Sequence, residues 1–446
     1  MKKLASTALA TALALGASAC DDGTVDPSDE TTFTVTIENV SALYDFTQSG
    51  VFNTPVGAAG PGPAFPGDSY EFSFGAAPGS YLTFATMFVQ SNDFFYAPDG
   101  MGIPLYNADG TRKSGDVTDY LELWDAGSEE DQEPGLGPDQ APRQAGPDTG
   151  AADDDTTVRL AADTYNNLPD IGDVIRATLT PINDYEFTLR IENLSDAMTL
   201  MTSDGATHPV PLSPGVFVVH TGADPLFTVG ADERMEGLAA IAEDGDASAL
   251  GMNVEGRTGI TGPISPGVYA SSTLPAVLFS SGSADFGDGL EAIAEDGDPS
   301  GLGGVLAGTA GLTDTGVFNT PVGAAGPAPA FPGESYSFEV VGQRGDRLHL
   351  ATMYVQSNDL FFSPSDQGID LFNGRNAISG DITAEFRLYD AGTEVNEWPG
   401  IGPNQAPRQA GPDTGADENG VVARVNDGFD YPDVGDVIRV TITPNG

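Results

Sequence analysis

Cysteine is almost absent from this chain: Cys20 is the only one among 446 residues, so no intramolecular disulfide can form. Histidine is nearly as scarce, and the three present leave little material for a zinc site or a Ser-His-Asp triad. Only 17 basic residues stand against 66 acidic ones, and the formal net charge of -49 repels nucleic acid and anionic membrane surfaces. No phosphate loop of the form GxxxxGK occurs. A disulfide scaffold, a nucleic-acid binder and a P-loop enzyme are therefore excluded.

Long apolar runs are also missing after the first 20 residues, which argues against a transmembrane helix. Within residues 1–20 a basic pair, an apolar stretch and a small-residue run lead directly to Cys20, an order typical of an export signal. We expect Cys20 to be lipidated, with an ordinary secretory signal as the alternative, and residues 21–32 to form a flexible tether. The protein is then exported, either as a cell-envelope lipoprotein or as an extracellular protein, and touches the membrane only through a lipid.

Glycine (57) and proline (33) are abundant, which favours short strands joined by many turns. Residues 33–41, FTVTIENVS, alternate apolar and polar side chains as a half-buried strand does, and residues 187–195, FTLRIENLS, repeat the pattern. The sequence therefore predicts an all-β fold made of antiparallel β-sandwiches.

Most of the chain is duplicated, and the copies follow the same order. The corresponding segments are 50–72 with 316–338, 85–129 with 351–394, 141–151 with 406–416, and 168–181 with 431–444. The segment APRQAGPDTGA is identical in both copies, which predicts an ordered surface loop rather than a linker.

Two domains follow from this duplication. We expect the first at residues 33–181 and the second at residues 185–446. The second alone would carry an insert, residues 201–310, which is itself a doublet with one short helix in each half. The apolar spacing around Leu238 and around Leu290 places side chains on one helical face in each of these helices. The first domain would lack these helices.

Acidic residues recur at three positions in each copy, after one strand and around a D-A-G-S/T-E turn at the end of another. Calcium prefers six to eight hard oxygen ligands, and three carboxylates at one rim of a sandwich would supply part of that set. Spacing alone does not separate this hypothesis from solvated loop acids, or from adaptation of an acidic chain to salty surroundings. The six residues are Asp93, Asp125, Glu129, Asp359, Asp390 and Glu394.

The two central segments resemble the spondin N-terminal domain. The resemblance is carried by VQSNDFFYAP with GDVTDYLELWDAGSE in the first copy, and by VQSNDLFFSP with GDITAEFRLYDAGTE in the second. It implies an eight-stranded antiparallel β-sandwich similar to C2 domains, with a calcium ion held at one edge. The implied ligands are Asp93, Asp125 and Glu129 in the first copy and Asp359, Asp390 and Glu394 in the second. Both glutamates stand where the family has aspartate, and the side chain of glutamate is longer by one methylene group.

We therefore expect a non-enzymatic, calcium-binding protein of the adhesion or matrix type, with one calcium ion per domain. Its partner would be an extracellular matrix polymer, a glycan or a surface protein. Two alternatives remain open: a glycan hydrolase that uses paired carboxylates, and a purely structural surface spacer.

Overall fold

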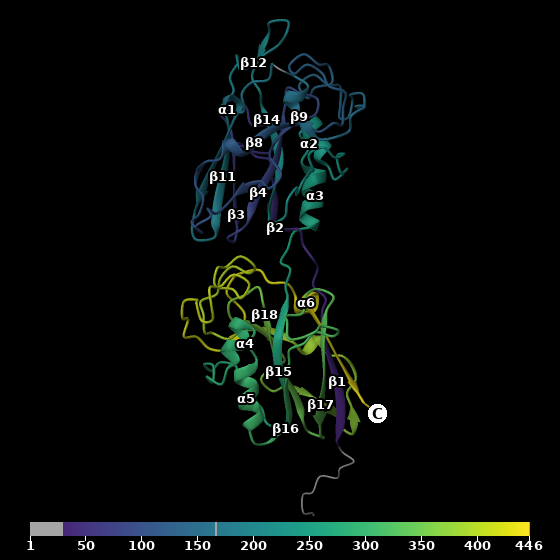
Figure 1. The fold of residues 1–446 in the computed structure, drawn as a ribbon, viewed down its shortest axis with the longest axis vertical. Helices are drawn as coiled ribbons and strands as arrows, with labels where there is room; N and C mark the ends of the chain where they lie inside the picture. Colours follow the sequence, from purple (N-terminus) through teal and green to yellow (C-terminus); the bar gives the residue numbers. More distant parts are fainter. Residues whose placement is uncertain (1–29, 166, 446) are drawn as a thin grey trace, which may run out of the picture.

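The structure is a computed structural model that describes residues 30–165 and 167–445. Two strand-rich bodies are stacked along the long axis of the molecule (Figure 1). Helices are few and short, so the predicted all-β class is confirmed.

The upper body in Figure 1 is called domain I and spans residues 46–256. Its strands are β2 (Phe46–Phe52), β3 (Ser69–Gly75), β4 (Tyr81–Phe88), β5 (Phe94–Pro98), β6 (Ile103–Pro104), β7 (Gly115–Asp116), β8 (Leu121–Asp125), β9 (Arg159–Leu160), β10 (Ile175–Pro181), β11 (Glu186–Asn193), β12 (Leu200–Met201), β13 (Thr207–His208) and β14 (Leu212–His220). Its helices are η2 (Thr118–Tyr120), η3 (Ala161–Asp163), α1 (Ile171–Val174), α2 (Leu238–Asp244) and α3 (Ser248–Gly256).

The lower body, domain II, combines the first strand of the chain with residues 264–444. Its strands are β1 (Thr31–Asn39), β15 (Ile264–Ser272), β16 (Leu312–Phe318), β17 (Ser335–Gly342), β18 (Arg347–Tyr354), β19 (Leu360–Ser363), β20 (Ile369–Asp370), β21 (Phe372–Asn373), β22 (Asn376–Ala377), β23 (Gly380–Asp381), β24 (Arg387–Asp390), β25 (Ala423–Arg424) and β26 (Ile438–Pro444). Its helices are α4 (Leu290–Asp296), α5 (Ser300–Gly308), η4 (Thr383–Glu385) and α6 (Val434–Val437).

Each domain contains two sheets that enclose a common apolar core. In domain I the strand orders are β3-β11-β10-β7 and β2-β14-β4-β5-β8-β9, and all of these pairs are antiparallel. Leu189 of the smaller sheet and Phe84 of the larger sheet are both fully buried in the same cluster. The alternation in strands such as β1, where Phe33, Val35 and Ile37 are buried, produces this apolar inner face.

A pair of short helices covers the outer face of each larger sheet. In domain I, Leu238, Ile241 and Ala242 of α2 are buried against a second cluster that includes Phe95 and Trp124. The equivalent residues of α4 pack the same way in domain II, as the helical periodicity predicts. The helices thus form a third layer that lies beside the larger sheet.

The two domains have the same topology but a different chain order. In domain II the strand orders are β17-β1-β26-β23 and β16-β15-β18-β19-β24-β25. The registers also agree: Ile191 lies opposite Tyr70 in domain I, and Ile37 lies opposite Tyr336 in domain II. The strand β11, with the sequence FTLRIEN, therefore follows most of the other strands of domain I along the chain. Its counterpart β1, with the sequence FTVTIEN, precedes all the other described strands of domain II. Domain I is a circularly permuted copy that is inserted between β1 and β15 of domain II.

This pairing corrects the expected division into residues 33–181 and 185–446. The N-terminal strand β1 pairs with β17 and β26, and β11 pairs with β3 and β10 (Figure 1). The two halves of the helical doublet belong to different domains: α2 and α3 pack on domain I, and α4 and α5 pack on domain II. The prediction that the first domain lacks these helices was wrong. The physical reason is that β1 and β11 have nearly the same sequence, so local pattern cannot say which copy of the remaining strands each one joins.

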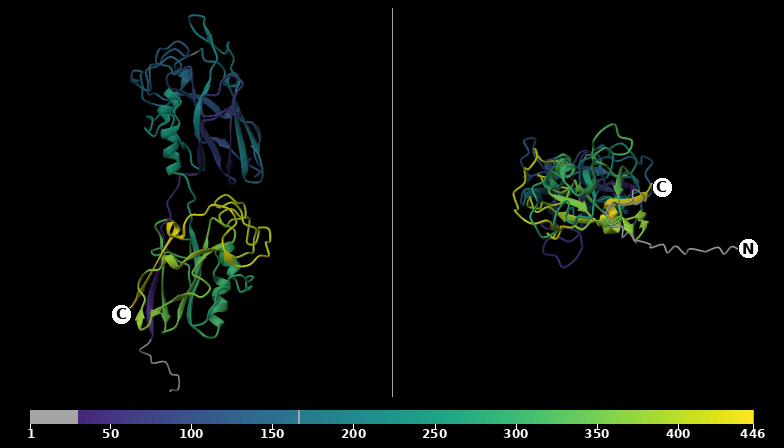
Figure 2. Two further views of the ribbon diagram at one scale, coloured as in Figure 1. Left: turned by 180° about the vertical axis from the view of Figure 1, so that it is seen from behind. Right: turned by 90° about the horizontal axis from the view of Figure 1, so that it is seen from below.

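Two chain segments connect the domains, residues 40–45 and 257–263 (Figure 2). They are hydrogen-bonded to each other, from Tyr44 N to Thr261 Oγ1 at 3.1 Å and from Asp45 N to the Arg257 carbonyl oxygen at 3.1 Å. In domain I the equivalent connection runs from β11 to β14, and it contains only the hairpin β12–β13. The double connection limits the ways in which one domain can move against the other.

Candidate metal centres

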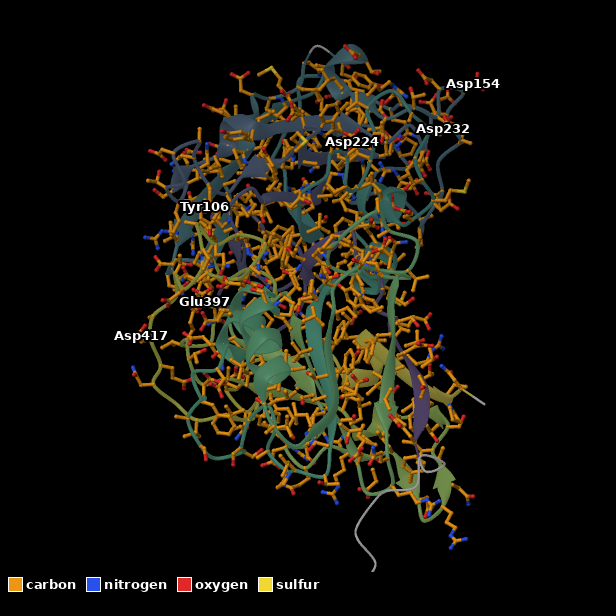
Figure 3. All side chains as sticks on the ribbon, turned by 60° about the horizontal axis from the view of Figure 1, so that its bottom comes forward. Tyr106, Asp154, Asp224, Asp232, Glu397 and Asp417 are labelled. Atoms are coloured by element: carbon orange, nitrogen blue, oxygen red, sulfur yellow. The ribbon has the colours of Figure 1, made fainter. Side chains whose placement is uncertain are left out.

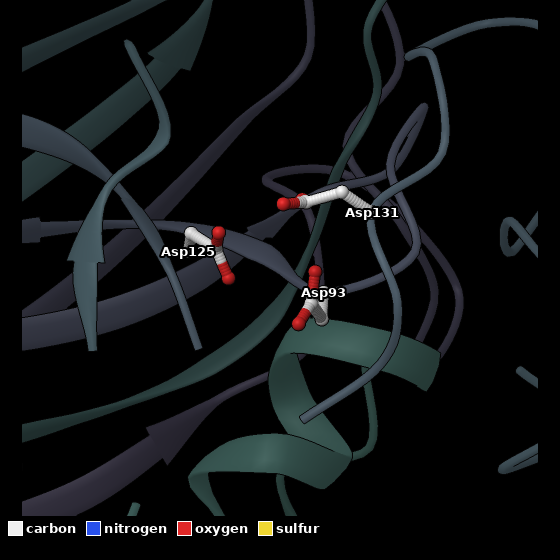
Figure 4. Close-up of side chains that lie close together, drawn as sticks. All are labelled: Asp93, Asp125 and Asp131. Atoms are coloured by element: carbon white, nitrogen blue, oxygen red, sulfur yellow. The ribbon is translucent and has the colours of Figure 1, made fainter. Parts of the chain in front are cut away.

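Three carboxyl groups meet at the end of the larger sheet in domain I (Figure 4). They belong to Asp93, directly before β5, to Asp125, the last residue of β8, and to Asp131, and one oxygen of each lies within 4.8 Å of the others. Asp93 and Asp125 are fully buried. We call this group aspartate cluster I.

Asp93 is held by the D-A-G-S-E turn that follows β8. Its Oδ2 accepts hydrogen bonds from the backbone N–H groups of Ser128 (3.0 Å) and Glu129 (3.2 Å). Gly127 has a φ of 67°, which allows the turn to bend back toward the strand. Asp93 Oδ1 is buried and has no hydrogen-bond partner among the described residues. Burying a carboxylate oxygen without a partner costs free energy of folding, so a positive charge near the cluster would stabilise it.

Arg159 supplies that charge in domain I. It stands on β9 opposite Asp125, and its Nη2 lies 2.6 Å from Asp125 Oδ2 and 3.1 Å from Asp131 Oδ2. The same nitrogen lies 2.6 Å from Asp153 Oδ2. Burial by itself lowers the pKa of Arg159, but the hydrogen bond that Arg159 donates to Asp153 and the charges of Asp125 and Asp131 outweigh it and raise that pKa. The guanidinium is therefore a permanent internal cation.

Domain II has the same arrangement in aspartate cluster II, formed by Asp359, Asp390 and Glu418. Asp359 is fully buried, and its Oδ2 accepts hydrogen bonds from the N–H groups of Thr393 (3.0 Å) and Glu394 (3.1 Å). Its Oδ1 has no partner among the described residues. Asp390 Oδ2 accepts a hydrogen bond from Asn396 Nδ2 at 2.6 Å.

The two aspartate clusters differ at the position of the arginine. Across the strand pair β24–β25, Asp390 faces Ala423, whereas Asp125 faces Arg159. Asn396 also occupies the position of Asp131, and its carbonyl Oδ1 is buried without a hydrogen-bond partner in the described part of the chain. Aspartate cluster II therefore has unpaired oxygens and no cation at the position of Arg159, since the arginine of β25, Arg424, lies opposite Tyr389 and is exposed.

Burial raises the pKa of the aspartates in both clusters, and the equivalent residues Asp93 and Asp359 are both shifted well upward. Burial and the charge of Asp390 raise the pKa of Asp359 to about 8. Burial and the charge of Asp131 raise the pKa of Asp125 to about 7, although Arg159 opposes the rise. Ionising each cluster fully at neutral pH thus requires a cation close by.

A second acidic group lies beside each aspartate cluster. Glutamate cluster I consists of Glu129, Asp148 and Glu243, with one oxygen of each within 4.8 Å of the others. Glutamate cluster II consists of Glu291, Glu295 and Asp413 by the same measure. These groups join a helix (α2 or α4) to the identical loops 141–151 and 406–416.

The structure brings together four of the six predicted ligands in the expected pairs, Asp93 with Asp125 and Asp359 with Asp390. Glu129 reaches Asp93 through its backbone N–H, but its carboxylate belongs to glutamate cluster I. Glu394 is placed alike: its Oε1 accepts a hydrogen bond from Gly415 N at 2.6 Å. Cys20 lies outside the described residues.

Sequence reasoning missed several residues at these sites. They are Asp131, Asp148, Asp153, Arg159 and Glu243 in domain I, and Glu291, Glu295, Asn396, Asp413 and Glu418 in domain II. The signal that could have found some of them is their recurrence: Asp148 and Asp413 occupy the same place in the identical loops. The acids of α2 and α4 had no such signal, because the topology that brings them to the loops was not anticipated.

An apolar pocket lies next to the acidic groups in each domain. The pocket of domain II has a volume of about 560 Å³ and is lined by Pro329, Phe331, Met353 and Pro407, among others. The pocket of domain I measures about 540 Å³ and has the corresponding lining: Pro63, Phe65, Met87 and Pro142. Phe331 and Phe65 remain 52% and 55% exposed, which is unusual for phenylalanine.

Many other acids lie on the surface. Asp154, Asp232 and Asp417 are exposed at the margins of the molecule (Figure 3).

None of the described helices is long and apolar enough to cross a membrane. The chain matches no family model and no curated protein, so the resemblance to the spondin N-terminal domain stays a prediction.

Proposed function

We propose that this protein is an exported, non-enzymatic calcium-binding protein of the cell envelope or extracellular matrix, built from two spondin-type domains. The observation that carries the proposal is the unpaired, buried Oδ1 of Asp359, a residue grouped with two further carboxylates, where Ala423 stands at the position of Arg159. In domain I the same position is occupied by Arg159, a natural substitute for a bound cation.

Calcium suits aspartate cluster II because all available donors are hard oxygens. Asp359, Asp390 and Glu418 offer carboxylates, and Asn396 offers a buried carbonyl oxygen. The donors come from several separate loops, which fits the flexible six- to eight-fold coordination of calcium better than the strict octahedron of magnesium. Water would complete the shell on the side of the exposed Glu418.

Binding is favoured over hydrolysis. In a glycosidase the two carboxyl groups stand roughly 5 to 9.5 Å apart and face a sugar. Here one oxygen of each residue lies within 4.8 Å of the others, and Asp359 is fully buried, out of reach of a polymer. The spacing and burial are those of a ligand set.

The twin pockets are the proposed contact points for the partner. Their proline, phenylalanine and methionine linings favour an apolar side chain of a surface protein over a glycan or a matrix polymer of polar repeat. Each pocket shares a loop with the neighbouring acidic groups, because Pro407 lies in the loop that carries Asp413. A cation that orders this loop would also shape the pocket.

Thermal unfolding of the exported protein, with excess calcium, with magnesium and with chelator at fixed ionic strength, tests the proposal. Calcium at 100 times its dissociation constant stabilises the folded state by about 2.7 kcal/mol. Asp359→Asn should reduce the calcium-specific rise in the Tm of domain II by the share that aspartate cluster II contributes, whereas Asp93→Asn, in the cluster that contains Arg159, should leave that rise intact. A wild-type protein without any calcium-specific rise would overturn the proposal and favour a structural spacer.

A further inference from the structure

We propose that glutamate cluster II is a second divalent-cation site, separate from aspartate cluster II, and that it is closed by the identical loop 406–416. Its ligands would be Glu291 and Glu295 of α4, Asp413 of the loop, and Glu394 of the D-A-G-T-E turn. The proposal does not require aspartate cluster II to bind calcium.

Unpaired buried oxygens indicate that something is missing from this group. Glu295 is 2% exposed and its Oε1 has no hydrogen-bond partner among the described residues. Glu394 is also 2% exposed, and its Oε2 is unpaired in the same sense. Burial, together with the charges of Glu394 and Glu291, raises the pKa of Glu295 to about 8. A solvated surface cluster would show none of these features.

Two hydrogen bonds hold loop 406–416 against the acidic residues of glutamate cluster II and its neighbours. Gly415 N donates to Glu394 Oε1 at 2.6 Å, and Gln409 Nε2 donates to Asp296 Oδ1, at the end of α4, at 2.6 Å. A Cβ atom at Gly415 would lie only 2.2 Å from Glu394 Oε2, so the loop approaches the carboxylate more closely than any other residue type allows. These contacts hold Asp413 over the two glutamates of α4.

Domain I provides an internal comparison. Glutamate cluster I has the matching residues Glu129, Asp148 and Glu243, and Gly150 N donates to Glu129 Oε1 at 2.7 Å. Ala239 stands where domain II has Glu291, so this cluster has one carboxylate fewer. We therefore expect glutamate cluster I to hold the same ion more weakly. The same loop sequence thus contacts equivalent acidic side chains in both domains.

The chemistry points to calcium. All four side chains are carboxylates, the hard oxygen donors that calcium prefers, and they come from three different segments that can adjust to a large ion. Magnesium, which demands octahedral geometry and releases water reluctantly, should bind less tightly.

Calorimetric titration of the full, chelator-treated protein with calcium chloride tests the proposal. Wild type, Glu295→Gln, Asp359→Asn and the double variant are compared at equal concentration and fixed ionic strength, with Glu385→Gln, an exposed residue of η4, as the control. Glu295→Gln should lose one equivalent of bound calcium, Asp359→Asn a different one, and the double variant both. Glu385→Gln should bind as wild type does.

A Glu295→Gln variant that is folded by circular dichroism and binds as many equivalents as wild type, with the same affinity, would overturn the proposal. If that variant does not fold, Glu291→Gln, at a half-buried position, decides instead. At least tenfold weaker binding of one equivalent supports the second site, and unchanged binding overturns it. Loss of the equivalent only in Asp359→Asn would retain the proposed function and reject the second site.

Discussion

Arg159 Nη2 lies 2.6 Å from Asp125 Oδ2, across the strand pair β8–β9. In the other domain the residues at these positions are Ala423 and Asp390. One copy of the duplicated site therefore carries its cation on the chain, whereas the other copy has an alanine at that position. This replacement, together with Asn396 in place of Asp131, makes the two domains a matched pair for experiments on cation dependence.

Exchanging the arginine and the alanine should exchange the calcium responses. Arg159→Ala leaves the carboxylates of aspartate cluster I without compensation, and removing one partner of a buried ion pair costs about 3–5 kcal/mol. In chelator the melting of domain I should fall accordingly, and calcium should restore part of the loss. Ala423→Arg should remove the part of the calcium response of domain II that comes from aspartate cluster II. Differential scanning calorimetry with and without calcium measures both, and an Arg159→Ala protein that melts as wild type does in chelator would contradict the assigned role.

Stability of the calcium-free protein should fall as pH rises from about 5 to 8. The folded pKa of Asp359, about 8, lies above the unfolded value of about 3.9. Between these values the folded state binds more protons than the unfolded state, so the stabilisation is complete below the unfolded pKa and is lost as pH approaches the folded one. The slope is at most about 1.4 kcal/mol per pH unit for each such group. Urea unfolding at several pH values measures it, and Asp359→Asn should remove the part of the slope that Asp359 contributes, while saturating calcium should reduce the slope.

Cutting the two connections should release domain I as a folded unit. Protease sites placed within residues 41–44 and 258–262 would leave β1 bound to β17 and β26 through its backbone hydrogen bonds. Size-exclusion chromatography and mass spectrometry should then find the N-terminal peptide with residues 263–446, separate from domain I. Recovery of that peptide with domain I would contradict the inserted topology. Cutting only at 41–44 is the control, since domain I then stays covalently attached to domain II.

Two equivalent glycines should tolerate no side chain. A Cβ atom at Gly215 would lie 2.1 Å from the Ala85 carbonyl oxygen and 2.4 Å from Phe52 Cζ, and one at Gly267 would lie 2.1 Å from the Ala351 carbonyl oxygen. Gly215→Ala should destabilise domain I, and Gly267→Ala domain II, each by about 1–3 kcal/mol. Gly326→Ala, where nothing lies within 4 Å, is the control. Calorimetry that resolves the two transitions should show each variant lowering only one of them.

The sequence determined the local parts of this protein. The alternation in residues 33–41 and 187–195 predicted half-buried strands, and the periodicity around Leu238 and Leu290 predicted helices with one buried face; both are confirmed. The pairing of Asp93 with Asp125 was left open by spacing alone and was expected from the resemblance to the spondin N-terminal domain; the structure brings the two residues together. Such features depend on neighbours that are near in sequence or fixed by sheet geometry.

Only the tertiary structure decided how the duplicated parts are combined. Because β1 and β11 are nearly alike, either could complete either domain, and the choice depends on strand pairing over hundreds of residues and on the two short connections. That choice brings Glu243 to Glu129 and Glu295 to Asp413, and so builds acidic groups that no spacing in the sequence marks. The position of Arg159 in one cluster, and of Ala423 in the other, acquires its meaning only when β9 and β25 are paired with the strands that carry the aspartates.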